Sequence, residues 1–331
     1  MREIAFIKKN KQKWMTFEHS LSVKEDRKPD ELADAYLQLL NDLSYSQTYY
    51  PKSKTTEYLN HLVAQIYRKI YKTKRLERNR VKVFFMEEVP NIMYIYRKQL
   101  IFAFALFFFF TAIGALSAAY DERFVRIILG DSYVNKTLEN IENGDPMAIY
   151  KSGSKLNMFL GITMNNIGVA FKAYIFGLSA GVMTFFIAMQ NGIMLGSFQY
   201  FFFEQGVLGA SLRGIWLHGA MEIFSIVIAS MAGFVLASSI LFPGTYSRFE
   251  SFKTGARQSM KIVISTIPFF VAAGFIEGFV TRQSNTMPLW LNILIICATL
   301  AVISFYYLVL PFINHKKTTH DRLSTVQKKE L

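Results

Sequence analysis

The sequence predicts an all-α membrane protein, a polytopic helical bundle of about six spans preceded by a cytoplasmic helical domain. Several apolar stretches reach the roughly 20 residues that a helix needs to cross a bilayer. The composition is divided, because 52% of the 331 residues are hydrophobic while 18% are charged. The net charge of +13 comes from basic residues that gather outside the apolar stretches.

The charge and the residue patterns of residues 1–98 predict a basic cytoplasmic domain made of helices. They hold 20 of the 37 Lys and Arg residues against 12 acidic residues, and no stretch long enough to cross a membrane. The patterns predict a helix near the N-terminus, a second from Pro29 to Tyr50, and a third from about Thr55 to Arg80. The basic run around the end of the third helix indicates a solvated or lipid-facing surface. Residues 83–99 predict an interfacial segment that leads into the bilayer.

The transmembrane bundle is predicted over residues 99–314, followed by a basic cytoplasmic tail at 315–331. Spans are expected at residues 100–119, 167–190, 192–210, 215–244, 262–281 and 289–314. The third is expected to be short, broken or re-entrant, because Glu204 and Gly206 interrupt it. Residues 120–160 carry five basic and six acidic residues, which predicts an extracytoplasmic loop with one or two short helices. The basic loops predict that both termini lie in the cytoplasm.

Charge, cysteine content and motifs narrow the classes of function. On a membrane protein, positive charge indicates orientation and contact with anionic lipid, so we expect membrane lipids and no nucleic acid as partners. The single cysteine, Cys297, excludes an intramolecular disulfide. The sequence has no G-x-S-x-G elbow, phosphate-binding glycine loop or CxxC motif. We therefore expect no cofactor, no bound metal and no enzymatic activity.

Small residues four positions apart predict close helix packing in lipid. The pairs are Gly177 with Gly181, Gly192 with Gly196, Gly233 with Ala237, and Gly274 with Gly278. One interpretation is a tightly packed monomeric bundle, and the other is the interface of a homo-oligomer.

The stretch 215–244 is the element around which the chain is organised, because it carries an ionisable pair inside a membrane span. His218 and Glu222 lie four residues apart and share one helix face. The predicted topology places Glu277 at the same depth of the outer leaflet. Asn165, Asn166 and Lys172 are expected at a similar depth, whereas Asn191 is expected near the inner face.

Three interpretations of this polar cluster stay open. The first is a buried network in which the polar side chains satisfy one another and hold the helices together. The second is a binding or conduction site that takes up protons or a cation. The third is an intramembrane metal hydrolase with His218, Glu222 and Glu277 as ligands, which the lack of a second His in any span disfavours.

Several motifs in order resemble the stage II sporulation protein M family of prokaryotic membrane proteins. They are NNIGVAFKAYIFGLSAG from Asn165, NGIMLG from Asn191, HGAMEIFSIVIASMAGFVLASSILFPG from His218, and AGFIEGF around Glu277. REIAFIKKNKQKW and DLSYSQTYYPKSKTTEYLNHLVAQIY resemble the N-terminal part of the longer members. One departure is Leu217, which stands where the family often has Pro before the His.

The resemblance implies a membrane anchor of an envelope complex with no enzymatic activity of its own. Longer members of the family accompany MoxR-type AAA ATPases, von Willebrand-like proteins and RDD membrane proteins, in bacteria that do not sporulate. We therefore expect a scaffold that couples cytoplasmic partners to envelope processes. The alternative is a transporter or channel for a small solute, ion or lipid that uses His218, Glu222 and Glu277.

Overall fold

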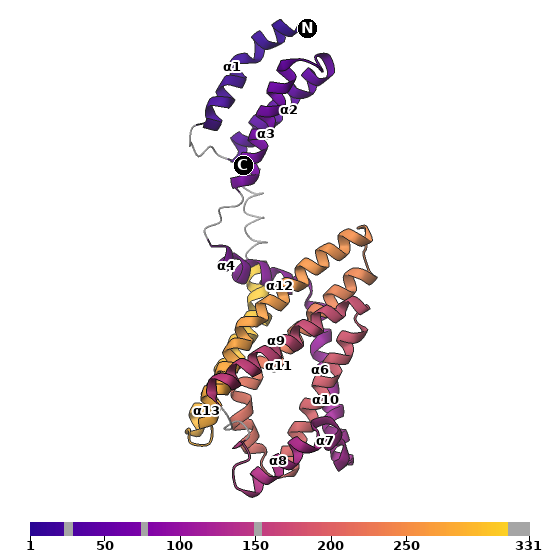
Figure 1. Cartoon of the computed structure of the whole chain (residues 1–331), viewed down its shortest axis with the longest axis vertical. Coiled ribbons are helices and arrows are strands. Elements are labelled where there is room, and N and C mark those ends of the chain that lie inside the picture. Colours follow the sequence, from indigo (N-terminus) through magenta and orange to yellow (C-terminus); the bar gives the residue numbers. More distant parts are fainter. Residues whose placement is uncertain (23–28, 74–78, 149–153, 317–331) are drawn as a thin grey trace. The chain divides into compact units, whose positions relative to one another are not determined.

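The computed structural model describes residues 1–22, 29–73, 79–148 and 154–316, and these residues are almost entirely helical (Figure 1). No strand occurs in these ranges, so the predicted all-α class is confirmed. The chain divides into two compact units, Met1–Arg80 and Val81–Leu331.

The N-terminal unit is a three-helix domain with a core of its own. It consists of α1 (Glu3–Ser22), α2 (Pro29–Tyr49) and α3 (Lys54–Thr73). The core is made of Phe6, Trp14, Ala35, Leu39, Leu43, Leu59, Leu62, Val63 and Ile66. The Trp14 indole donates a hydrogen bond to Asp42 over 2.8 Å, which joins α1 to α2. The start of α2 and its end beside Pro51 lie where the sequence predicted them. The predicted extension of the third helix to Arg80 lies partly in residues 74–78, outside the described residues.

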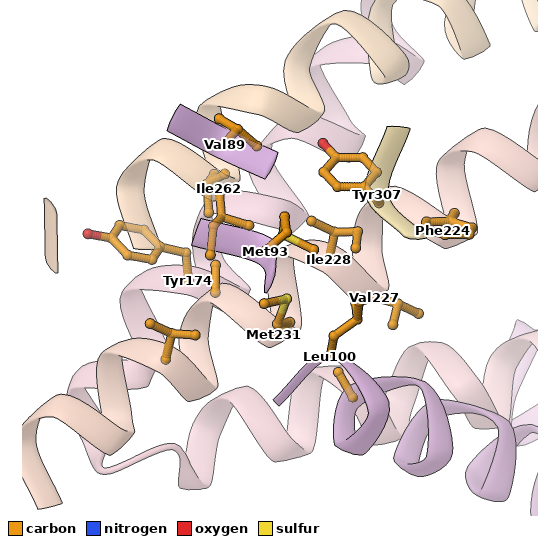
Figure 2. Close-up of a cluster of buried hydrophobic side chains, with 14 of the residues drawn as sticks. Val89, Met93, Leu100, Tyr174, Phe224, Val227, Ile228, Met231, Ile262 and Tyr307 are labelled. Carbon is orange, nitrogen blue, oxygen red and sulfur yellow. The ribbon is translucent and has the colours of Figure 1, made fainter. Parts of the chain in front are cut away.

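The segment predicted as interfacial belongs to the second unit. It forms α4 (Arg80–Val83), the π-helical turn η1 (Phe84–Glu88) and α5 (Val89–Ile95). Val89 and Met93 are buried beside Ile228 and Met231 of the bundle (Figure 2). The boundary between the compact units therefore lies before this segment, at Arg80, because its apolar side chains pack into the bundle core.

Five helical segments among the described residues are long and apolar enough to cross a membrane. They are α6 (Arg97–Tyr120), Lys155–Ser179, α11 (Leu208–Leu241), Arg248–Gln283 and Leu289–Lys316. Three of these segments consist of more than one helical element. The segment from Lys155 contains α9 (Lys155–Ile175) and η3 (Phe176–Ser179), and the segment from Arg248 contains α12 (Arg248–Phe275), η4 (Ile276–Val280) and η5 (Thr281–Gln283). The segment from Leu289 contains α13 (Leu289–Ser304) and η6 (Phe305–Val309). In α11, 72% of its apolar 18-residue stretch is buried, whereas the corresponding share is 22% or less in the segments that contain α6, α9 and α13. α11, which contains most of the predicted stretch 215–244, is therefore the central helix of the bundle.

The second and third predicted spans have different boundaries in the structure. The chain turns at Ala180 and Gly181, whose φ angles of 56° and 87° lie in the left-handed region. Ser179 accepts a hydrogen bond from the Met183 amide across this turn. The next helix, α10 (Val182–Glu204), is continuous, so the spans predicted at 167–190 and 192–210 are corrected. The boundary predicted between these two spans at residue 191 lies inside α10, whereas the interruption predicted at Glu204 and Gly206 is where α10 ends and the chain turns before α11.

The glycines of the predicted small-residue pairs lie against other helices of the same chain. A Cβ on Gly196 would collide with the Thr111 carbonyl of α6, and one on Gly192 would lie 2.7 Å from the Phe107 oxygen. A Cβ on Gly177 would collide with the Gly233 carbonyl of α11, and one on Gly233 would collide with the Ala173 carbonyl of α9. Gly274 and Gly278 lie against α9, and Gly181 lies against Ala237. These faces are used inside the chain, as the packed-bundle interpretation expects.

Two short helices close one end of the bundle. The predicted loop at 120–160 contains α7 (Glu122–Leu129) and α8 (Asp131–Glu142), which lie at one end of the bundle in Figure 1. Asp121 caps α7 by accepting a hydrogen bond from the Arg123 amide. Val125 and Val134 pack with Phe201 and Phe202 of α10. We call this the α7–α8 end, and the candidate site lies next to it.

Candidate functional site

Three ionisable side chains meet between α11 and η4. His218 and Glu222 lie one helical turn apart on α11, so both point to one side. Glu277 lies in the π-helical turn that follows α12. One ligand atom from each of the three residues lies within 4.8 Å of the others. Within this group, His218 Nε2 lies 3.6 Å from Glu277 Oε2.

The site is shielded from solvent. His218 is 3% exposed and Glu277 is 6% exposed. The Oε1 atom of Glu222 is buried and has no hydrogen-bond partner among the described residues. Ionisable groups at membrane depth are costly and usually pair or face a cavity. The carboxylate of Glu222 therefore has an unused acceptor in a region of low dielectric.

A hydrogen-bond relay fixes the orientation of the imidazole. His218 Nδ1 lies 3.1 Å from Thr281 Oγ1, and Thr281 Oγ1 donates to the Ile276 carbonyl over 3.4 Å. With the hydroxyl proton of Thr281 on that carbonyl, we assign the tautomer of His218 that donates Nδ1–H to Thr281 Oγ1. The neutral imidazole then has its lone pair on Nε2, which faces Glu277.

A cavity of about 360 Å³ opens beside the three side chains. His218, Glu222 and Glu277 line one wall. Tyr133 of α8 also lines it, and the remaining surface is largely apolar, with Leu129, Met194, Phe198 and Ile223. A concave apolar site with a few converging polar groups is typical of small-ligand binding. The cavity lies between α11 and the helices of the α7–α8 end.

The other predicted members of the cluster separate into two groups. The Asn166 amide lies within hydrogen-bonding reach of the Glu222 carboxyl group, so it belongs to the site. Asn165 and Lys172 are exposed. At about 100° per residue, Asn165 points about 100° away from Asn166 and Lys172 about 120° away. Asn191 lies in the middle of α10 and donates to the Ile187 carbonyl over 2.8 Å, rather than lying near a membrane face.

Thr281 and Tyr133 are site residues that the sequence analysis missed. Thr281 follows Glu277 by four residues, the same spacing that identified His218 with Glu222, so this signal was present in the sequence. Tyr133 comes from α8, about 85 residues before His218, and no periodicity relates the two positions. Only the packing of α8 over the bundle brings it to the cavity.

The fold and the site define the class of protein. It is a polytopic α-helical membrane protein with an ionisable cluster in the membrane and a separate helical unit at its N-terminus. The chain belongs to the stage II sporulation protein M family, whose model matches residues 103–282. This range runs from within α6 to within η5 and contains every ionisable residue of the site.

The N-terminal unit matches a different family. A model described as a domain of unknown function, DUF8413, covers residues 4–72 and therefore α1 to α3. No curated protein and no solved structure shows significant similarity to the chain. The two family matches fall in the two compact units, so the chain combines two separate modules.

Proposed function

We propose that the protein is a non-enzymatic scaffold or anchor in a bacterial cytoplasmic membrane, with both termini in the cytoplasm. This topology needs an even number of crossings, so the proposal counts α10 as a sixth span beside the five apolar segments. Its N-terminal unit docks cytoplasmic partners of the AAA ATPase type and couples them to processes of the cell envelope. The observation that carries the proposal is the division into two compact units, each with its own core. A helical module with a core of its own has a surface on which a partner can dock. The family membership of the bundle supports a role in the envelope.

A groove on the N-terminal unit is the surface that we assign to docking. It has a volume of about 340 Å³ and lies between α1 and α3. Trp14, Met15 and Tyr58 form its apolar part, while Lys11 and Lys54 stand at its rim. Aromatic residues and Met are enriched at the centres of protein interfaces, and charge at the rim guides association. The groove therefore fits an acidic partner surface that carries one or more apolar side chains.

Charge reversal in this groove is expected to release the partner. We expect Lys11→Glu to reduce co-purification of the cytoplasmic partner about tenfold or more, because a like charge would face the acidic surface. Lys9→Glu is the matched control, since Lys9 is exposed on α1 but does not line the groove. Quantitative mass spectrometry of the full-length protein purified from its native membrane measures the amount of partner per copy of the protein. Equal loss in both variants, or loss in neither, would contradict docking at this groove.

A second function is favoured by the cavity beside His218, Glu222 and Glu277. In this candidate the bundle transports or conducts a small solute, ion or lipid. The supporting observation is the unpartnered Oε1 of Glu222 at the wall of a cavity, in a membrane-spanning helix. Ionisable residues in such positions commonly mark ion or substrate pathways.

Glu222→Gln distinguishes the two functions. For transport, we expect this variant to abolish flux in proteoliposomes that report proton or cation entry with an enclosed dye. For the scaffold, it should leave co-purification of the partner unchanged. Glu204→Gln is the control, because Glu204 is exposed at the end of α10 and does not line the cavity. Absence of flux in the wild-type protein would count against transport of these ions.

A further inference from the structure

The spacing of the three ionisable side chains is that of a metal-ligand set. Their ligand atoms lie within 4.8 Å of one another, and His218 Nε2 lies 3.6 Å from Glu277 Oε2. Nitrogen and oxygen ligands around tetrahedral Zn²⁺, at bond lengths of about 2.0–2.2 Å, lie about 3.4 Å apart. Side-chain movements of roughly an ångström would bring all three atoms into coordination distance.

The orientation of His218 favours a cation between it and Glu277. The relay through Thr281 leaves the lone pair of Nε2 directed at Glu277. An ionised carboxylate presents a second lone pair to it, and 3.6 Å is too long for a direct hydrogen bond. A metal ion between the two atoms would accept a lone pair from each. A histidine that donates its other ring N–H to a neighbouring oxygen is the usual arrangement in metal sites.

The charge of the site leads to the same conclusion. The two carboxylates of Glu222 and Glu277 lie side by side in a membrane-embedded region. In the described part of the chain, the only resolved ion-pair partner of Glu277 is His218, and Glu222 has none. One divalent cation would neutralise both carboxylates while the imidazole stays neutral. It would also give the buried Oε1 of Glu222 a partner.

We propose that His218, Glu222 and Glu277 bind a single divalent first-row transition-metal ion, for which Zn²⁺ and Co²⁺ serve as the test ions. Asn166 and Thr281 are positioning residues, since they contact Glu222 and His218 rather than the metal. Three protein ligands leave a fourth tetrahedral position, and the adjoining cavity gives a water or small ligand access to it. This inference is independent of the scaffold function proposed above.

Metal binding is tested on the full-length protein in nanodiscs. The protein is treated with a chelator, loaded with Zn²⁺, freed of unbound metal and analysed by elemental mass spectrometry. We expect about one Zn²⁺ per chain in the wild type, and loss of this ion in His218→Ala, Glu222→Gln and Glu277→Gln. His61→Ala is the control, because His61 is exposed on α3 in the N-terminal unit. Stoichiometry near zero in the wild type, or unchanged stoichiometry in the three variants, would overturn the proposal.

The role of Thr281 gives a second measurement. Thr281→Val removes the acceptor for His218 Nδ1–H and should weaken Zn²⁺ binding about 10- to 100-fold, as changes next to metal ligands typically do. Thr281→Ser keeps the hydroxyl and should retain the wild-type affinity. Equal affinity of the two variants would contradict the positioning role.

Cobalt substitution keeps the test decisive if the ligand variants do not fold. Co²⁺ in the wild-type protein should show the intense visible absorption of a four-coordinate ion and should be displaced by Zn²⁺. A weak spectrum typical of six-coordinate Co²⁺ would instead indicate a surface-bound ion and would overturn the proposal.

Discussion

Replacement of Gly196 by alanine is expected to lower the stability of the bundle by about 1–3 kcal/mol, as overpacking does in well-packed interiors. The added Cβ would lie 2.7 Å from the Ala115 nitrogen and closer still to the Thr111 carbonyl oxygen. Both atoms belong to the backbone of α6, so α6 and α10 must separate to admit the methyl group. Gly196→Leu should prevent accumulation of folded protein.

A glycine of α9 provides the control for this substitution. Gly168 has open space around the position of a Cβ. Gly168→Ala should therefore leave the stability unchanged or raise it slightly, since alanine favours a helix over glycine. Thermal unfolding of the purified variants in nanodiscs makes the comparison. If Gly196→Ala and Gly168→Ala have the same melting temperature, α6 and α10 do not approach as closely as described.

Replacement of Trp14 by alanine should unfold the N-terminal unit. Trp14 is 3% exposed, and its ring centroid lies 5.4 Å from that of Phe6. Removal of a buried aromatic side chain costs about 3–5 kcal/mol. A domain of this size has a total stability near the lower end of about 5–15 kcal/mol. Trp14→Ala should also release partners that dock on this unit, because Trp14 lines the proposed groove.

Hydrogen exchange on the full-length protein measures this effect unit by unit. In Trp14→Ala, amide protection should fall in α1–α3 and stay unchanged in α11, because the two units have separate cores. Trp14→Phe should have a smaller effect, since it keeps most of the apolar volume and loses only the bond to Asp42. Leu37→Ala is the control, because Leu37 is 57% exposed on α2. Loss of protection in α11 as well would contradict the independence of the two cores.

Composition and periodicity were sufficient for the class of the protein and for part of its site. The long apolar stretches predicted an all-α membrane bundle, because helices are the structures that satisfy their backbone hydrogen bonds inside lipid without closing a barrel. The spacing of four residues placed His218 and Glu222 on one face, since the helical period is a local property. Alternating the direction of successive spans predicted Glu277 near these two residues, and the structure places its carboxyl group 3.6 Å from His218.

The turn at Ala180 and Gly181 could not be located from hydropathy. The apolar residues continue through it, and Gly181 was assigned to packing because of its spacing from Gly177. A glycine in a membrane span favours either close packing or a left-handed turn, and only its neighbours decide between them. Here Gly181 takes both roles, with a φ of 87° and a position close to Ala237.

The sequence by itself determined which residues are apolar, that the chain is helical and which side chains share a helix face. The tertiary structure alone decided that Asn166 faces Glu222 while Asn165 and Lys172 face away, and that Tyr133 covers the cavity. The physical reason is that the helical period fixes angles within one helix. The rotation of each helix about its axis, and the neighbour it meets, depend on how the whole bundle packs.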